Sequence, residues 1–125
     1  MAKSKRREPA NTEREWWALL KSDDRTVIRS LREWKAALGD PATSPLQGCD
    51  PKAVRHFTKN LRFKNGGLAH ADYSQIARQM SYFQFRDLWG RFGLGMSLFE
   101  DHKDMECEKR ATCGRHFGNI CTSNC

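Results

Sequence analysis

The amino-acid sequence predicts an all-α fold, a small bundle of four to six helices with a cysteine-rich, metal-organised C-terminal tail. Two observations favour helices: apolar residues recur at three- and four-residue steps, and residue types that cap helices stand in front of those stretches. A third observation sets the C-terminus apart, because four of the five cysteines lie between residues 107 and 125. A chain of 125 residues is long enough for one domain with a modest core.

The chain divides into three predicted segments. Residues 1–11 are basic and polar without periodicity, which predicts a disordered arm. Residues 12–104 carry the helix signals and form the expected helical domain, and residues 105–125 form a cysteine-rich C-terminal segment.

Two helices are predicted before residue 40. Thr12 and Glu15 have the spacing of a capping box, in which a hydroxyl accepts a hydrogen bond from the third amide of the helix. Ser22-Asp23-Asp24 is typical of a second N-cap, and the apolar spacing behind it predicts a helix that ends at Gly39. Trp16 and Trp17 are adjacent and cannot both face one core, so we expect one of them at a boundary or in contact with a protein partner.

The middle of the chain contains further start and stop signals. Asp50-Pro51 predicts a helix start, because proline at the first helical position loses no hydrogen bond. Asn65-Gly66 ends this helix but is also a hairpin signal, so a short β-ribbon over residues 60–71 is an alternative. Asp72 can cap the next segment, whose apolar stripe changes phase near Ser81 and therefore predicts two helices or a kink. A last short helix is expected over residues 98–106.

The cysteine-rich segment predicts a structural zinc ion. Zinc takes four Cys or His ligands in a tetrahedron, and short ligand pairs such as Cys-x2-His and Cys-x3-Cys present two ligands from one turn. Metal binding would also supply folding energy to a segment with few large apolar residues. The candidate ligands, with His102 as a further alternative, are Cys107, Cys113, His116, Cys121 and Cys125.

Three alternatives use the same cysteines. Four thiolates can hold an iron–sulfur cluster, which would make the protein a redox protein or accessory subunit. Two disulfides can staple the segment if the compartment is oxidising. Unligated thiols are the remaining interpretation.

Positive charge is concentrated in two places. The formal net charge is +7, of which residues 1–35 contribute +4 and residues 51–65 contribute +5, whereas residues 100–125 sum to −1. Such local excess favours nucleic acid or another polyanion as the partner, through release of condensed counterions. The candidate contact residues are Lys3, Lys5, Arg6 and Arg7 in the arm and Arg55, Lys59, Arg62 and Lys64 in the internal segment.

The sequence indicates a cytoplasmic protein without a membrane partner. The basic N-terminus has no apolar stretch behind it, unlike a secretory signal, and no apolar run approaches the length of a membrane span. A reducing compartment also favours metal binding over disulfides for clustered cysteines.

No motif names a reaction. His70 has Asp72 close by in sequence but no nucleophile paired with it. The two glycine-rich stretches, NGG and GRFGLG, do not match a nucleotide-binding fingerprint. We therefore expect a small nucleic-acid-binding or regulatory protein with a structural zinc site, with a non-enzymatic role favoured and catalysis left open. Two alternatives to this function stay open. One is the iron–sulfur protein, and the other is a protein–protein adaptor or inhibitor that uses its basic surface.

Overall fold

The computed structural model describes residues 9–39, 44, 46–109 and 112–122, and it combines helices with a four-stranded antiparallel sheet. The all-α prediction is therefore wrong. In chain order the elements are α1 (Glu13–Lys21), α2 (Leu31–Gly39), α3 (Pro51–Lys59), β1 (Arg62–Lys64), β2 (Gly67–Asp72), the 3-10 helix η1 (Ile76–Gln79), α4 (Tyr82–Arg91), α5 (Met96–His102), β3 (Lys103–Lys109) and β4 (Thr112–Cys121).

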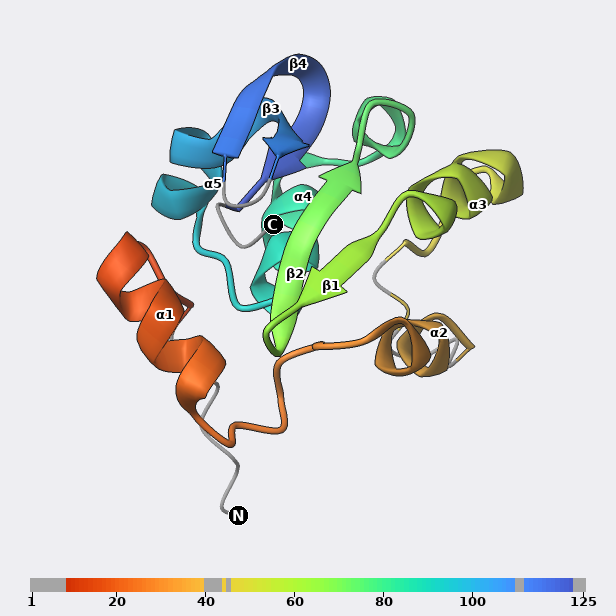
Figure 1. The fold of residues 1–125 in the computed structure, drawn as a ribbon. Helices are drawn as coiled ribbons and strands as arrows, with labels where there is room; N and C mark the ends of the chain where they lie inside the picture. The colour runs from red at the N-terminus through yellow and green to blue at the C-terminus, as the bar shows by residue number, and fades with distance from the viewer. Residues whose placement is uncertain (1–8, 40–43, 45, 110–111, 123–125) are drawn as a thin grey trace.

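The sheet has the strand order β1-β2-β4-β3, so β1 and β3 are its edges. Figure 1 shows α4 behind β2, with α2 and α3 at the right of the view and α1 and α5 at the left. Each strand pairs antiparallel with its neighbour, and the pairing of β2 with β4 joins segments about fifty residues apart. The C-terminal strands thus belong to the same sheet as β1 and β2.

The first described residues are part of the core. Ala10 is buried, and its amide donates to the Gly93 carbonyl at 2.8 Å, while its own carbonyl accepts from the Gly95 amide at 2.7 Å. The sequence placed Ala10 inside the expected disordered arm of residues 1–11, of which residues 1–8 lie outside the described residues.

The cap of α1 was predicted correctly, but the start of α2 was not. The Thr12 hydroxyl accepts from the Glu15 amide at 3.1 Å, as the capping box requires. Helix α2 begins only at Leu31, because the Asp24 carboxylate accepts from both the amide and the hydroxyl of Thr26 and forms a turn instead of a cap. Val27 and Ile28 are buried in the non-helical segment that follows.

Arg29 joins three parts of the fold. Its guanidinium donates to the Leu19 and Leu20 carbonyls at 3.1 and 3.2 Å, which lie in the last turn of α1, where carbonyls lack helical partners. A further bond of 2.9 Å reaches the Gly66 carbonyl in the β1–β2 turn. The side chain therefore holds α1 against the hairpin.

The hairpin of β1 and β2 confirms the β-ribbon alternative. Asn65 and Gly66 have φ values of 53° and 83°, the positive values that a two-residue hairpin turn requires. The helix before it starts as predicted, with Pro51 in the first turn and the Asp50 carboxylate accepting from the Lys52 amide at 3.1 Å.

Aromatic side chains dominate the core. Trp34, Phe57, Trp89 and Phe92 are fully buried, and their ring centroids lie 5.3–6.4 Å apart in five contacts among helices α2, α3 and α4 and the Phe92 cap. Rings in tilted and edge-on contact at these distances contribute stability beyond their buried area. This cluster fixes α3 by its inner face and leaves its outer face in solvent.

A β-hairpin replaces the expected metal-organised tail and part of the last predicted helix. Helix α5 ends at His102, and β3 follows directly, pairing with β4. Cys113 and Cys121, both in β4, form a disulfide with their Cα atoms 5.9 Å apart, whereas eight residues of straight strand span roughly 26 Å. Strand β4 therefore bends back on itself. Gly118 has a φ of +85°, and a Cβ atom there would lie 2.8 Å from Cβ of Ser74.

Candidate functional site

The strongest charged surface lies on α3 and β1. Lys52, Arg55 and Lys59 are exposed at three- and four-residue steps, which places them on one stripe of α3. Arg62 and Lys64 are exposed on the edge strand β1, while Phe63 between them packs on the core. We call these five residues the basic face.

The segment that carries the basic face contains no acidic residue of its own. Residues 51–71 contain no acidic side chain, and in the described part of the chain no carboxylate lies within ion-pair distance of Lys52, Arg55, Lys59 or Arg62. The Arg62 guanidinium donates to the carbonyls of Lys59 and Leu61 at 3.0 and 2.8 Å, so it caps α3 and links the helix to the strand. Of the predicted contact residues, Arg55, Lys59, Arg62 and Lys64 are thus brought together.

A polar cluster joins α3 to the sheet beside the basic face. We call it the polar junction and define it as His56, His70, Asp72, Ser74 and Asn119. Nε2 of His56 lies 3.0 Å from Oδ2 of Asp72, in ion-pair range but without the alignment of a hydrogen bond. Burial would raise the pKa of the Asp72 carboxyl, but hydrogen bonds from the Ser74 hydroxyl and amide, with the His56 contact, outweigh it and hold that pKa below its usual value.

The second histidine of the junction bridges α3 and β4. Nδ1 of His70 lies 3.2 Å from the carbonyl oxygen of Asn60, the C-cap of α3. Its Nε2 lies 2.7 Å from Oδ1 of Asn119, whose side chain is buried. Both ring nitrogens of His70 are therefore engaged within the protein.

The contacts of the polar junction are those of a structural cluster. The Ser74 hydroxyl donates to Asp72 at 2.7 Å, so it does not face a histidine nitrogen that would activate it as a nucleophile. Cys121 stands opposite His70 in the sheet register, but it is buried and held in the disulfide. The junction fixes α3 against β2 and β4, and through α3 it fixes the basic face.

Among the residues that the structure describes, no metal-binding group is found at the predicted zinc site. Cys113 and Cys121 are bonded to each other, so neither offers a thiolate, and the described residues hold no group of three or more metal-ligating side chains. A four-thiolate iron–sulfur site needs the same two cysteines. Cys107 lies opposite Cys113 in the backbone register of β3 and β4; its side chain and Cys125 lie outside the described residues.

The histidines proposed as ligands have carboxylate partners. His116 is exposed on β4, with Nδ1 3.5 Å from Oε1 of Glu106 on β3. His102 ends α5, where Nε2 lies 3.1 Å from Oε1 of Glu13 in α1. The basic residues predicted for the arm, Lys3, Lys5, Arg6 and Arg7, lie outside the described residues.

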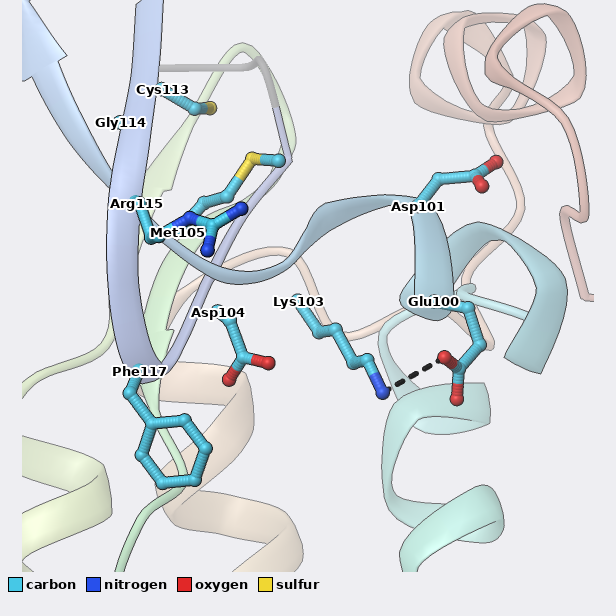
Figure 2. Close-up of a pocket in the computed structure, with 9 residues that line it drawn as sticks. All are labelled: Glu100, Asp101, Lys103, Asp104, Met105, Cys113, Gly114, Arg115 and Phe117. Carbon is cyan, nitrogen blue, oxygen red and sulfur yellow. Dashed lines mark ion pairs between the residues drawn. The ribbon is translucent and has the colours of Figure 1, made fainter.

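A cavity of about 420 Å³ lies between the end of α5 and the β3–β4 hairpin. Figure 2 shows the Lys103 ammonium turned toward Glu100, 2.9 Å from its carboxylate. Oδ1 of Asp104 accepts from the Tyr73 hydroxyl and the Gly118 amide, each at 3.0 Å. Glu100, Lys103 and Asp104 are thus engaged within the protein itself, and we assign the cavity no ligand.

Two other features bear on function. Trp16 is fully buried and Trp17 is half-buried, so only Trp17 has surface to offer a protein partner. Cys49 is the free cysteine among the described residues, and burial raises the pKa of its thiol, which lowers the fraction of reactive thiolate.

Comparisons with family models, curated proteins and solved structures found no match to this chain. Among the described residues, no helix has the length and apolar character needed to cross a membrane. The functional assignment therefore depends on the geometry of the site.

Sequence reasoning found the basic face but missed the polar junction and Arg29. The face occupies one contiguous segment, so its charge is visible in the linear sequence. The junction brings His56, Asp72 and Asn119 together from three elements, and only the pair His70 and Asp72 gave a local signal. Arg29 binds backbone carbonyls, which no residue pattern marks in advance.

Proposed function

We propose that this protein binds nucleic acid through the basic face and acts as a non-enzymatic binding or regulatory module. One observation carries the proposal: five basic side chains lie exposed on one helix and the adjoining edge strand, in a stretch of 21 residues without an acidic side chain. A polyanion that meets such a surface releases its condensed counterions, which favours binding.

The support of α3 strengthens the proposal. Its inner face is held by Phe57 in the aromatic core, its start by the Asp50 cap, and its end by the His70 and Arg62 contacts. Charged side chains on a rigid element keep their spacing when they meet a partner, so less ordering entropy is lost on binding.

Charge reversal tests the proposal. The double variant Arg55→Glu with Lys59→Glu should bind an oligonucleotide roughly tenfold more weakly, and the slope of log K against log salt should fall by about 2, one for each phosphate contact removed. Fluorescence anisotropy over a salt series measures both quantities.

A matched control separates the basic face from net charge. Arg32 and Lys35 are exposed on the neighbouring helix α2, and Arg32→Glu with Lys35→Glu changes the net charge by the same amount. We expect the control to keep most of the affinity and slope. Equal losses of affinity in both variants would mean that binding depends on net charge alone. Unchanged binding in the Arg55/Lys59 variant would contradict the proposed function.

The cytoplasmic location stays a prediction. The Cys113–Cys121 disulfide is of the kind that oxidising compartments favour and that cytosolic reductants remove. Trapping the free thiols at the moment of cell lysis, followed by mass spectrometry, measures whether this bond exists in the cell.

A further inference from the structure

Two aromatic side chains are exposed at the start of α4. Tyr82 and Phe83 have relative exposures of 60% and 64%, and they are neighbours in sequence and in space, with ring centroids 5.6 Å apart. The Arg86 guanidinium lies 5.0 Å from the centroid of the Phe83 ring. Large aromatic rings gathered on a surface mark an interaction site more often than isolated apolar residues do.

The fold holds these rings outward. The Ser81 hydroxyl accepts from the Gln84 amide at 3.1 Å, and the Gln84 carboxamide accepts from the Ser81 amide at 2.9 Å, which fixes the first turn. Phe85, which is opposite Phe83 on the helix, packs against Tyr73, Trp89 and Phe99 with centroid distances of 5.3–5.7 Å. Phe83 therefore faces away from the packed side of α4, and Tyr82 is exposed beside it as the first residue of the helix.

Hydrogen bonds place the rings at one end of the basic face. The Gln84 side chain donates to the Gln47 carbonyl at 3.5 Å, in the turn that leads into α3. From η1, the Gln79 side chain accepts from the amide of Asp50, the residue that caps α3, at 2.5 Å. The start of α4 is thus tied to the start of α3, whose first exposed basic residues are Lys52 and Arg55.

We propose that Tyr82 and Phe83 form a stacking platform for the unpaired bases of a single-stranded nucleic acid, whose phosphates follow Lys52, Arg55 and Lys59. The inference rests on the proposed function and names its substrate class. A strand that crosses exposed aromatics beside a basic stripe can stack its bases on the rings, whereas the bases of a duplex are occupied by each other. Arg86, beside Phe83, lies 3.7 Å from the Asp87 carboxylate, so the phosphate contacts are assigned to the basic residues of α3.

The test compares single-stranded and duplex oligonucleotides of about 12 nucleotides, a length within known site sizes for such surfaces. Tyr82→Ala with Phe83→Ala should weaken binding of oligouridylate or oligothymidylate roughly tenfold. The salt slope and the duplex affinity should not change, because no phosphate contact is removed. Comparing the two single strands identifies whether RNA or DNA is preferred.

Two controls make the result specific. Phe117→Ala removes a ring of 85% exposure on β4, outside the platform, and should leave affinity unchanged. Phe83→Trp keeps an aromatic surface and should retain single-strand binding. Unchanged single-strand affinity in the Tyr82/Phe83 variant, or an equal loss for duplex, would overturn the platform. These outcomes concern the platform alone. If the proposed function itself is wrong, charge reversal at Arg55 and Lys59 will leave nucleic-acid binding unchanged.

Discussion

The aromatic core around α3 and α4 and the β3–β4 hairpin are stabilised in different ways. In the core, Trp34, Phe57, Trp89 and Phe92 are fully buried, so hydrophobic burial and ring packing provide the stability. In the hairpin, Phe117 is 85% exposed, and the bend of β4 is held by the Cys113–Cys121 disulfide.

Polar bonds complete the attachment of the hairpin. Asp104 accepts from the Tyr73 hydroxyl and the Gly118 amide, and Ile120 of β4 is fully buried in the core. Regions built by burial should respond to cavities, whereas regions built by cross-links should respond to loss of the link. The same deletion should therefore have unequal effects in the two places.

The largest expected effect is in the core. Phe57→Ala removes a ring that touches Trp34, Trp89 and Phe92 and should lower the free energy of unfolding by about 3–5 kcal/mol. Phe117→Ala deletes the same atoms from the hairpin surface and should cost below about 0.5 kcal/mol. Urea unfolding curves for the two variants measure the difference. Similar costs would mean that Phe117 is buried against the protein in solution.

Loss of the disulfide should have the second largest effect on stability. Replacing Cys113 and Cys121 together by alanine opens a loop of about nine residues, for which chain entropy gives about 2.5 kcal/mol. Cys49→Ala, at the free cysteine among the described residues, should have a small effect.

The loss should be local. We expect amides of β3 and β4 to exchange hydrogen faster in the disulfide variant, while those of α3 keep most of their protection, because the aromatic core does not depend on the bond. Hydrogen exchange followed by mass spectrometry resolves the two regions. A uniform loss of protection would show that hairpin and core unfold as one unit.

The same contrast explains what the sequence could predict. The Thr12 cap and the Asp50-Pro51 start depend on residues within one turn, and both were correct. The Asn65-Gly66 turn was recognised as the alternative to a helix end and is the hairpin that forms. Local chemistry decides these features, so a local pattern reveals them.

The β3–β4 hairpin was missed because its place in the sheet depends on a distant partner, strand β2. Residues 103–109 alternate charged and less polar side chains, a strand pattern that resembles a solvated helix end when acidic residues dominate it. The cysteines were assigned to metal because spacing alone does not distinguish a ligand pair from a disulfide. Only the pairing of β4 with β2 brings the segment into the sheet.

The polar junction shows the same limit in the candidate site. The basic face was predicted from one stretch of charge, yet the groups that hold it in place are far apart in the chain: His70 and Asn119 are 49 residues apart. Their pairing depends on the sheet order, which the all-α prediction did not contain.

The smallest expected effect lies at the junction between the two regions. Asp72 contacts His56 of α3 and lies opposite Asn119 of β4 in the sheet register, so it links α3 to the β3–β4 hairpin. Its pKa is lowered in the folded state from the ordinary value of 3.8. A depressed carboxyl pKa stabilises the fold above the ordinary value, and this contribution is lost as the pH falls through the lower folded value.

Asp72→Asn should therefore lower the free energy of unfolding near pH 7 by less than about 1 kcal/mol, because the partly exposed carboxylate is screened by solvent. The difference in the free energy of unfolding between this variant and the unsubstituted protein should shrink below about pH 4, because protonation of Asp72 then removes the stabilisation that its carboxylate provides. Asp23→Asn, at an exposed acid between α1 and α2, is the control. The unsubstituted protein and the Asp72→Asn variant share every histidine, so the difference between their stability–pH profiles isolates the contribution of Asp72. A deficit that stays constant down to about pH 2 would mean that the asparagine disturbs packing and that the charge of Asp72 contributes nothing to joining α3 to the sheet.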